Sequence, residues 1–383
     1  MKKISVAVDA SRVRSGGGVA HLLGILDIEL TEDHPINEIH VWAHGKLLDL
    51  IPNRAWLIKH HPAEAEQSLP RQLYWQATKL AGEIKQTRCD ILLSVDASTL
   101  CRFKPMVVLS QNMLPYEDGI MPLYGLSKDR LRQAMIFQVQ KRAFHASDAT
   151  IFLTNHASSC IQKFCGQLPY STTIAHGVGE TFKQTALKNS WPSDKDRPIE
   201  CVYISPILEY KFQWVVVRAI KMLRDQGYSL NLSLVGGGGK RALKWLTEEL
   251  ARSDPDRQFV RIDEFIAHEN IATRIAEADL FIFASGCETF GISLLEAMAV
   301  GIPIACSDRS SLPETLRQGG VYFDPTQAAS IAKAVESLIL SSSKRDEIVK
   351  CAKELSTSYS WSLCAAQTWQ YVIETFQRVS KAT

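Results

Sequence analysis

The chain has 383 residues, of which 46% are hydrophobic and 22% are charged. This length exceeds the size at which one hydrophobic core keeps growing, so two domains of about 150 to 200 residues are expected. The formal net charge of +2 excludes the concentrated basic charge of a dedicated nucleic-acid binder. The nine cysteines are scattered along the chain, which is typical of buried side chains in a reducing compartment and not of a disulfide framework.

The N-terminal run at 1–9 has two lysines but only a short apolar stretch, which ends at Asp9. This pattern is typical of a first strand and not of a signal peptide. No stretch approaches the ~18 apolar residues that a membrane-spanning helix needs. We therefore expect a cytoplasmic protein, either free or attached peripherally to the inner face of the membrane.

Short runs rich in valine and isoleucine alternate with stretches of helical periodicity along the chain. Runs that are apolar on both faces suit strands of a parallel sheet covered by helices on each side. In the first half, strands are predicted at Ile4–Val8, Ile39–Ala43, Ile91–Val95, Met106–Leu109, Thr150–Leu153 and Thr172–Ala175. In the second half, they are predicted at Cys201–Ile204, Asn231–Val235, Phe259–Ile262, Leu280–Phe283, Ile302–Cys306 and Val321–Phe323.

Two successive βα arrays predict two doubly wound, Rossmann-like domains of the α/β class. Residues 179–198 are polar and lack a clear period, so they are the expected linker. Apolar residues at helix-like spacing predict a terminal amphipathic helix at 361–379. We therefore predict domains at 1–180 and 181–358 and a C-terminal helix at 359–383 that packs back on the first domain. The ligand is expected in the cleft between the domains, outside the carboxyl ends of the strands.

A glycine-rich loop follows the first predicted strand and precedes a helix. Gly17 and Gly18 lie in this loop. The context suits a loop that holds a phosphate or a sugar, because glycine permits a close backbone approach and a helix N-terminus favours an anion. The loop lacks the Gly-x-Gly-x-x-Gly pattern, so nicotinamide binding is not supported. A purely structural turn is the alternative.

The most informative segment is 283–303, where a predicted strand ends in a turn of small residues. A helix is predicted to begin near Gly291–Ser293 and to stop at Gly301. Unpaired N–H groups and a positive dipole end at its N-terminus favour a phosphate. Glu288 lies in the loop and Glu296 in the helix. Carboxylates are good acceptors for sugar hydroxyls, so both side chains are candidates for binding a sugar or ribose.

Residues 285–307 match the pattern Ser-x-x-Glu-x-Phe-Gly-x-x-x-x-Glu-Ala-Met-Ala-x-Gly-x-Pro-x-x-x-Ser. Here the chain resembles the retaining glycosyltransferases of family 4, also called glycosyl transferases group 1, of the polysaccharide and O-antigen assembly type. The resemblance implies the GT-B fold, in which two Rossmann-like domains face a cleft and the second domain binds the nucleotide-sugar donor. An ordinary sheet-packing helix is the alternative for this segment.

The resemblance implies two catalytic residues. Glu288 would position the donor sugar, and Lys211 matches the lysine that contacts the donor diphosphate in the family. A departing nucleoside diphosphate accumulates negative charge, which preorganised cations and backbone amides stabilise. Many members carry an arginine five or six positions earlier, where this chain has Ser205 and Pro206. A solvated surface lysine is the alternative for Lys211.

The remaining donor contacts come from glycine-bearing segments and from the predicted helix. Glu296 is expected to hold the ribose, and the amides of Thr289–Ile292 are expected to stabilise the diphosphate. The turn at Val235–Gly239 resembles a strand-end turn of the same domain, although it is also compatible with a plain loop. The expected donor-binding residues are Gly17, Gly18, Ser205, Gly236, Thr289, Phe290, Gly291, Ile292 and Glu296.

Three residues of the first half are candidates for binding the acceptor. Gln111 and Asn112 follow a predicted strand and resemble the acceptor-side loop of polysaccharide-assembly members. His176 matches the place where the family's chain crosses between domains. The alternatives are a capped turn for the two amides and a structural role for the histidine.

No metal site is predicted. Asp194 and Asp196, like Asp254 and Asp256, have the Asp-x-Asp spacing of metal-dependent transferases. Both pairs lie in polar connections, and neither directly follows an apolar strand. We expect no cofactor, because the nucleotide-diphosphate sugar is a co-substrate.

The sequence therefore predicts a metal-independent hexosyltransferase that uses GDP-mannose or a UDP-sugar and a saccharide acceptor, either free or lipid-linked. No nucleic-acid partner is expected. A basic, partly apolar helix around 128–142 is either a solvated face or a contact with an anionic membrane. The alternative functions are a GT-B sugar phosphorylase, a nucleotide-sugar epimerase and a non-catalytic subunit that binds a glycan or a nucleotide sugar.

Overall fold

The computed structural model describes residues 3–192, 197–264 and 266–382. Asp194 and Asp196, one of the two Asp-x-Asp pairs, lie outside the described residues. The chain forms two compact units. The first unit consists of Met1–Tyr116, Leu126–Gly177 and Ser360–Thr383, and the second consists of Glu117–Gly125 and Val178–Tyr359.

The first unit is built on a seven-stranded parallel sheet with the order β3-β2-β1-β4-β5-β6-β7. Its strands are β1 (Ile4–Asp9), β2 (Ile36–Trp42), β3 (Leu57–His60), β4 (Ile91–Ser94), β5 (Met106–Leu109), β6 (Ala149–Phe152) and β7 (Ser171–Thr173). Its helices are α1 (Gly17–Leu26), α2 (Gly45–Leu50), α3 (Leu69–Thr78), α4 (Leu80–Gln86), α5 (Lys128–Ala146), α6 (Asn155–Cys165) and α15 (Trp361–Ala382). The central strands β4, β5 and β6 are buried at every residue, as expected for a sheet covered on both faces.

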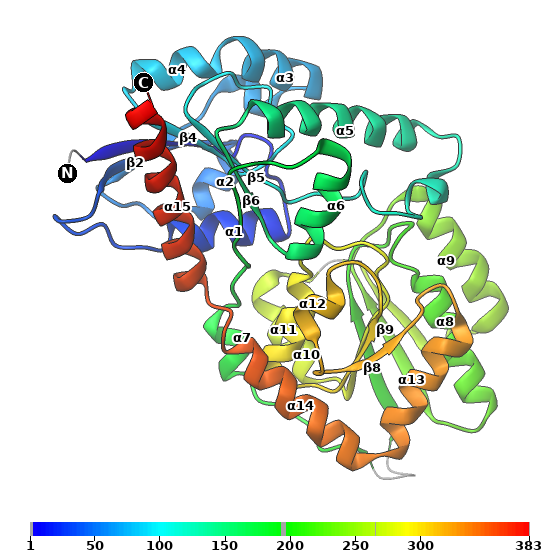
Figure 1. Cartoon of the computed structure of the whole chain (residues 1–383). Helices are drawn as coiled ribbons and strands as arrows, with labels where there is room; N and C mark the ends of the chain where they lie inside the picture. The colour runs from blue at the N-terminus through cyan, green and yellow to red at the C-terminus, as the bar shows by residue number, and fades with distance from the viewer. Residues whose placement is uncertain (1–2, 193–196, 265, 383) are drawn as a thin grey trace. The chain divides into compact units, whose positions relative to one another are not determined.

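The second unit is built on a six-stranded parallel sheet with the order β10-β9-β8-β11-β12-β13. Its strands are β8 (Ile199–Ile204), β9 (Leu230–Val235), β10 (Val260–Asp263), β11 (Leu280–Phe283), β12 (Ile304–Ser307) and β13 (Val321–Phe323). Its helices are α7 (Glu180–Gln184), α8 (Gln213–Asp225), α9 (Lys240–Ser253), α10 (Ile271–Ala276), α11 (Ile292–Val300), α12 (Leu312–Leu316), α13 (Ala328–Leu340) and α14 (Ser342–Ser356). Figure 1 shows the helices of this unit around its sheet.

Both sheets have the doubly wound order in which the chain reverses direction across the sheet after three strands. In the first unit this switch point lies between β1 and β4, and in the second it lies between β8 and β11. The prediction of an α/β protein with two Rossmann-like domains is therefore confirmed.

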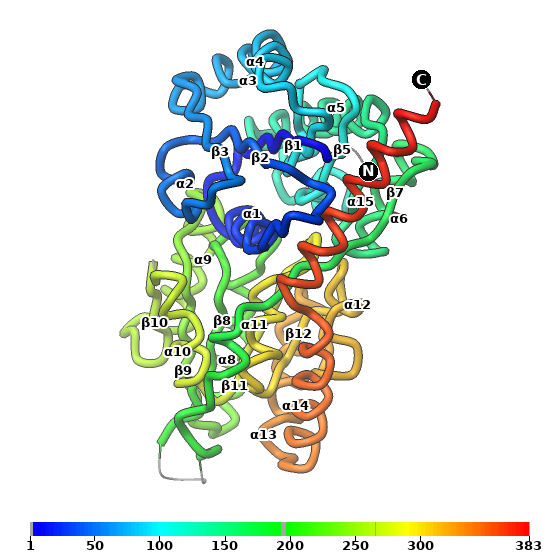
Figure 2. The backbone as a smooth tube through the Cα atoms, turned by 90° about the vertical axis from the view of Figure 1, so that its left-hand side faces the viewer, coloured from blue at the N-terminus to red at the C-terminus, as the bar shows by residue number. Residues whose placement is uncertain are grey.

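The C-terminal helix α15 packs on the first unit, as predicted. It runs alongside α1 in both views of the backbone (Figures 1 and 2). The indole nitrogen of Trp369 donates a hydrogen bond of 2.7 Å to the carbonyl oxygen of Ile25. A Cβ atom at Gly24 would lie 2.3 Å from the ring of Trp361, so glycine is required where the start of α15 meets α1.

Two elements differ from the sequence prediction. The edge strand β3 was not predicted, because it is only four residues long and buries only Leu57 fully. The segment predicted as an aperiodic linker contains the short helix α7, whose Phe182 is buried. Among the described residues, no helix is both long enough and apolar enough to span a bilayer.

Candidate functional site

The switch point of the second unit brings together the two residues that were predicted to be catalytic. Lys211 lies in the loop after β8, and Glu288 lies in the loop after β11. Ligands of doubly wound sheets bind outside the carboxyl ends of the strands at such a point. The ammonium group of Lys211 donates a hydrogen bond to Oε1 of Glu288, so the two side chains form an ion pair at the expected ligand site.

This ion pair is largely removed from water. The side chain of Lys211 is 7% exposed and that of Glu288 is 16% exposed. The Lys211 Nζ lies 5.2 Å from the ring centre of Tyr210 and 5.4 Å from that of Phe283, within the range of cation–π attraction. Burial, together with the nearby Glu288, raises the pKa of Tyr210, so its phenol stays neutral. Each charge of the pair therefore depends on the other for compensation.

The loop that carries Glu288 is fixed by two serines that follow β12. The Glu288 N–H donates a hydrogen bond of 3.0 Å to the hydroxyl of Ser310. The hydroxyl of Ser311 donates one of 2.7 Å to the Glu288 carbonyl oxygen. The Ser310 hydroxyl also lies 2.6 Å from Oε2 of Glu117, which belongs to the same unit. These contacts hold the backbone of Glu288 in place before any ligand binds.

The glycine turn after β9 lies directly against the end of β8. Gly236 has a φ of 135°, and a Cβ atom there would lie 2.5 Å from the carbonyl oxygen of Ser205. Ser205 is buried, and its hydroxyl faces the carbonyl oxygen of Pro206 at 3.2 Å. A neutral hydroxyl thus occupies the place where many family members carry a cation, and Lys211 is the cationic side chain of this loop.

The helix α11 begins and ends as predicted. Gly291, at φ 93°, lies at its N-cap and Gly301, at φ 85°, at its C-cap. Both are in the left-handed region, where glycine carries no Cβ penalty. Ile292 is the first helical residue, so its N–H and that of Ser293 have no acceptor within the helix, whereas Leu294 and Leu295 donate to the Gly291 carbonyl oxygen. Phe290 anchors the preceding turn by packing edge-on against Tyr359, with ring centres 5.6 Å apart. Thr289 is half-buried beside it.

Glu296 lies inside this helix and is buried. Burial raises the pKa of its carboxyl group, against the opposing effect of a hydrogen bond from His268. The His268 Nε2 lies 3.2 Å from Glu296 Oε1, and the same bond raises the pKa of His268. The histidine is exposed and packs edge-on against Phe182. Among the described residues, the side-chain hydrogen-bond partner of Glu296 is therefore a histidine that lies at the surface.

In the first unit, the predicted glycine loop leads into α1. Gly16 lies at the N-cap with a φ of 63°, and Gly17 is the first helical residue. A Cβ atom at Gly18 would lie 3.3 Å from a methyl group of Val13 and 3.4 Å from Oε1 of Gln111. Two segments that were predicted separately, the glycine loop and the loop after β5, therefore meet.

The amides of that second loop bind main-chain groups. Gln111 Nε2 donates a hydrogen bond of 2.9 Å to the carbonyl oxygen of Val95. Asn112 Oδ1 accepts one of 3.0 Å from the N–H of Leu114, which caps its own turn. Both residues are half-buried at the carboxyl end of β5. The geometry contains the capped turn that the sequence left as an alternative, and acceptor binding by these amides stays a prediction.

His176 is buried against a second histidine. Its Nδ1 lies 3.1 Å from Nδ1 of His21, and its ring lies 5.6 Å from that of Trp361. Burial lowers the pKa of His21 to about 3 and lowers that of His176 well below its usual value. Both imidazoles are therefore neutral at pH 7. Contact of His176 with an acceptor stays a prediction.

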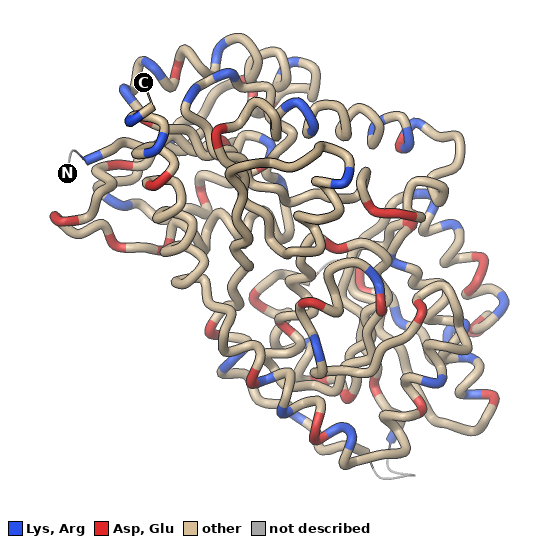
Figure 3. Tube along the Cα trace, in the orientation of Figure 1, with Lys and Arg blue, Asp and Glu red and all other residues tan. Residues whose placement is uncertain are grey.

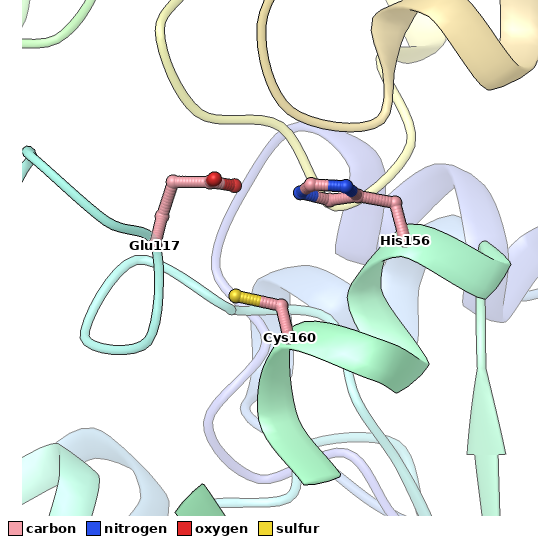
Figure 4. Close-up of side chains that lie close together, drawn as sticks. All are labelled: Glu117, His156 and Cys160. Carbon is pink, nitrogen blue, oxygen red and sulfur yellow. The ribbon is translucent and has the colours of Figure 1, made fainter. Parts of the chain in front are cut away.

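Two groups of residues resemble metal ligand sets, and absence of a metal stays a prediction. Asp254, the first residue of the second Asp-x-Asp pair, accepts hydrogen bonds from three consecutive backbone N–H groups, at 258–260. These bonds give its carboxylate a structural role. His156 and Cys160 lie one turn apart on α6 and point to the same side of it (Figure 4). Two side chains supply fewer ligands than zinc requires, and Glu117, also drawn there, belongs to the second unit.

Sequence reasoning missed the residues that support the site. Ser310 and Ser311 follow a strand that was predicted, so the rule that ligands gather at carboxyl ends would have indicated them. His268 follows β10 in the same way. The pairing of Lys211 with Glu288 joins positions 77 residues apart, and nothing in their local sequence indicates it.

Residues 183–355 match the family model described as "Glycosyl transferases group 1". Among curated proteins, the chain is 29% identical over 110 residues to the O-antigen chain mannosyltransferase B of Escherichia coli, which covers 29% of each protein. It is 25% identical over 249 residues to the alpha-D-kanosaminyltransferase of Streptomyces kanamyceticus, covering 62% of this chain and 63% of that protein. The chain spans less than half the length of the first curated relatives that it matches.

Solved structures resemble the whole chain in fold. The sucrose-phosphate synthase of Thermosynechococcus elongatus has a TM-score of 0.75 at 15% identity, with all of both chains covered. Anabaena HepE in complex with UDP and glucose has a TM-score of 0.70 at 17% identity, covering 96% of this chain and 98% of that one. The match to the group 1 glycosyl transferases thus covers most of the second unit, and the chain as a whole has the GT-B fold of the similar solved structures.

Proposed function

We propose that the protein is a retaining glycosyltransferase that moves a hexose from a nucleotide-diphosphate sugar to a saccharide acceptor. The observation that carries this proposal is the buried Lys211–Glu288 ion pair at the switch point of a group 1 glycosyltransferase unit. A buried ion pair costs desolvation free energy and is a weak source of stability. A ligand-binding role accounts for its place at the carboxyl edge of the sheet.

The second unit offers three groups to a donor diphosphate. The first is the Lys211 ammonium, which is held near two aromatic rings. The second is the N-terminus of α11, whose free amides and positive dipole end favour phosphate. The third is the Gly236 turn, where the absence of a side chain permits close approach. Together they would stabilise the negative charge that develops when the bond between the sugar and the phosphate breaks.

The carboxylates of Glu288 and Glu296 would accept hydrogen bonds from hydroxyl groups of the donor. Glu288 would release part of its bond to Lys211 and accept hydrogen bonds from the donor sugar. Glu296 would accept them from the ribose, which would displace the exposed His268 from its carboxylate. In the first unit, Gln111, Asn112 and the Gly17–Gly18 loop lie at the carboxyl edge of the sheet and would bind the acceptor and the donor sugar.

The expected chemistry is a front-face displacement with retention. The acceptor hydroxyl oxygen forms a bond to the anomeric carbon while the bond from that carbon to the phosphate oxygen breaks. The hydroxyl proton passes to the departing phosphate oxygen, so that no protein base is consumed. We further propose that the reaction needs no metal, since Lys211 and the α11 amides neutralise the diphosphate. Incubation with EDTA should then leave the rate unchanged.

The donor is tested first by thermal shift against GDP-, UDP-, ADP- and dTDP-sugars. A ligand at 100 times its Kd adds about 2.7 kcal/mol of stability, so the cognate nucleotide should raise Tm clearly. GDP-mannose and UDP-glucose head the panel, because similar proteins include a mannosyltransferase and a structure with UDP and glucose. If no nucleotide sugar raised Tm, the proposed donor site would be wrong.

Product analysis by mass spectrometry then separates the remaining functions. Transfer to a saccharide with release of nucleoside diphosphate is the expected result, and NMR of the product should show the donor's anomeric configuration. A requirement for inorganic phosphate with release of a sugar phosphate would indicate a phosphorylase instead. Conversion of the donor without an acceptor would indicate an epimerase. Donor binding without any turnover would indicate a non-catalytic subunit.

The names of the relatives indicate which class of acceptor to test. The O-antigen and colanic acid proteins among them are named for polysaccharide assembly, so oligosaccharides of cell-surface polymers are the acceptors to test first. Attachment to the inner face of a membrane belongs to the same proposal. Sedimentation with anionic vesicles tests it directly.

A further inference from the structure

A groove about 540 Å³ in volume lies between α3 and α5 on the first unit. This volume is within the range of about 300–1,000 Å³ that is typical of small-molecule sites. Its walls include Leu69 and Leu73 of α3 and Met135, Ile136 and Val139 of α5. The groove is therefore mainly apolar, although it is open to solvent.

The apolar wall is unusual for a helix surface exposed to water. Met135 is 56% exposed, and Leu131, one turn earlier on α5, is 63% exposed. Leu69 on the facing helix is 45% exposed. Contiguous exposed apolar side chains of this kind mark ligand grooves or interaction sites. Apolar side chains on both walls of the groove are therefore exposed, and no described segment of the first unit covers them.

One end of the groove reaches the switch point of the first unit. Arg12, in the loop after β1, lines the groove together with Ser98, in the loop after β4. Arg12 Nη1 donates a hydrogen bond of 2.8 Å to the Ser98 carbonyl oxygen, and its Nε lies 3.8 Å from Asp96. The groove thus runs from the carboxyl edge of the sheet, where a doubly wound unit binds its ligand, to the outer surface between two helices.

The groove also has cationic side chains, of which Arg12 is partly compensated by Asp96 at 3.8 Å. Arg12 and Arg132 line it, and its described lining includes no acidic side chain. No ion pair of Arg132 is found among the described residues. The helix α5 carries five lysine or arginine residues, one histidine and one acidic residue. Figure 3 shows blue segments near both ends of this helix. An apolar channel with cationic side chains complements a ligand that has an apolar chain and an anionic group.

From this charge and shape we infer that the groove binds the lipid-phosphate end of the acceptor, with a long alkyl or isoprenoid chain between α3 and α5 and its phosphate at Arg132 and Arg12. This inference rests on the proposed function and names its acceptor as a lipid-linked saccharide. The glycan attached to the phosphate would extend along the carboxyl edge of the sheet towards Gln111 and Asn112.

A single lipid chain fits the groove better than a bilayer surface does. Leu69 and Met135 are exposed, but Leu73, Ile136 and Val139 of the same lining are half-buried in the walls of a hollow that a flat bilayer surface would not fill. A hollow of this size holds one chain and shields it from water on two sides. Binding should therefore be saturable at one ligand per protein.

The test is calorimetric titration of the full chain with dodecyl phosphate below its micelle concentration. We expect saturable binding at one site and none with inorganic phosphate alone, because the apolar chain supplies most of the affinity. Met135→Asp should weaken binding about tenfold by placing a charge against the chain. Arg132→Gln should weaken it about fivefold by removing a cation from the phosphate. Leu340→Asp, at a 70% exposed position on α13 of the other unit, should bind as the wild type does.

Several outcomes would overturn the inference. One is absence of saturable binding of dodecyl phosphate. Another is equal binding by wild type, Met135→Asp and Arg132→Gln, which would place the ligand elsewhere. A third is binding only to phosphatidylglycerol vesicles, lost with Arg132→Gln but kept with Met135→Asp, which would indicate a membrane surface.

Failure of the inference is distinguishable from failure of the proposed function. Nucleotide-sugar binding and transfer to a free saccharide are measured separately on the wild type. If these persist while dodecyl phosphate does not bind, the groove assignment is wrong and the transferase stands. If dodecyl phosphate binds but no nucleotide sugar is used, the transferase is wrong and the lipid-phosphate groove needs another role.

Discussion

The carboxyl edges of the two sheets use different chemistry at corresponding switch points. In the second unit, Lys211 and Glu288 form a largely buried ion pair. In the first unit, the carboxylate of Asp9 at the end of β1 is held by Ser11 and Gln76 through neutral hydrogen bonds, and burial raises its pKa. The second edge thus holds a largely buried ion pair. At the first edge the buried carboxylate of Asp9 has uncharged partners, and the Arg12–Asp96 pair is longer, at 3.8 Å, and more exposed.

This difference fits the two substrates that the proposal assigns. A donor diphosphate is anionic, so the edge that binds it needs a preorganised cation. The saccharide part of an acceptor is neutral at its hydroxyls, so amides and backbone groups suffice to bind it. Arg12 and Arg132 of the first unit are needed only for the phosphate of a lipid-linked acceptor. The same fold therefore supports two kinds of recognition, and the distinction lies in a few side chains of the loops.

The largest expected effect comes from breaking the ion pair. Lys211→Met should slow transfer by about 10²- to 10³-fold, because it removes a preorganised charge from the leaving group. It should also destabilise the protein by about 3 kcal/mol, since the Glu288 carboxylate is left without its partner. Steady-state kinetics with the cognate donor and urea unfolding measure the two effects.

A double variant separates these two effects. Lys211→Met with Glu288→Gln should regain most of the lost stability and none of the transfer rate. Lys221→Met is the matched control, because Lys221 pairs with Asp225 on the surface and should cost less than about 1 kcal/mol. If the double variant transferred sugar at the wild-type rate, the donor edge would not depend on its charge.

The next effect concerns the close contact between two loops of the second edge. Gly236→Ala should destabilise the second unit by about 2–3 kcal/mol, because it places a Cβ atom against the Ser205 carbonyl at a positive φ. Gly237→Ala is the control, since its Cβ would lie 3.5 Å from the nearest atom and should change stability by less than about 0.5 kcal/mol. Urea unfolding that gave equal losses for the two variants would contradict the role of the close approach.

These two regions also show how far sequence reasoning extends. The strand–turn–helix around Glu288 was predictable, because glycines at both ends of α11 and an apolar helix interior are local signals. The strand-end rule indicates Ser310, Ser311 and His268 as residues near the site, but their hydrogen bonds to Glu288 and Glu296 were not predictable, because each joins distant segments through one side-chain rotamer. The strand β3 was missed because an edge strand buries too few residues to produce a clear apolar run.

The first unit shows the same limit in another form. The glycine loop, Gln111 and His176 were each singled out, yet nothing in the sequence placed Gly18 against Gln111 or His176 against His21. The order of the strands determines which loops are neighbours, and that order follows from the doubly wound rule. Side-chain partners within the edge depend on packing that local patterns do not encode.

A third prediction contrasts the pH dependence of the two units. His21 and His176 have lowered pKa values in the folded state, so below pH 6.5 the unfolded chain binds more protons than the folded one. Their contribution to stability is present above the unfolded pKa and is lost as pH falls towards about 3 for His21. Within this window, each of the two histidines should lower the free energy of unfolding of the first unit by about 1.4 kcal/mol for every unit that the pH falls.

The second unit should respond in the opposite direction. The folded pKa values of Glu296 and His268 are both raised, so their contribution is larger at acid pH and declines as pH rises through those values. Pulse proteolysis in urea at pH 7.5, 6.5 and 5.5 measures the stability of each unit, with mass spectrometry to assign the fragments to the two units. His21→Gln should flatten the slope of the first unit. An unchanged slope would show that this histidine is not the titrating group.

The smallest expected effect is at Gly18, a glycine in a loop at the edge of the first sheet. A Cβ atom there would meet the flexible ends of Val13 and Gln111 at 3.3–3.4 Å, and both can yield by a few tenths of an ångström. Alanine also favours the helix that begins at Gly17, so Gly18→Ala should change the free energy of unfolding by less than about 0.5 kcal/mol. A loss as large as that of Gly236→Ala would mean that the first edge is as tightly built as the second. Unchanged stability with a raised KM for the donor would place a ligand against this loop.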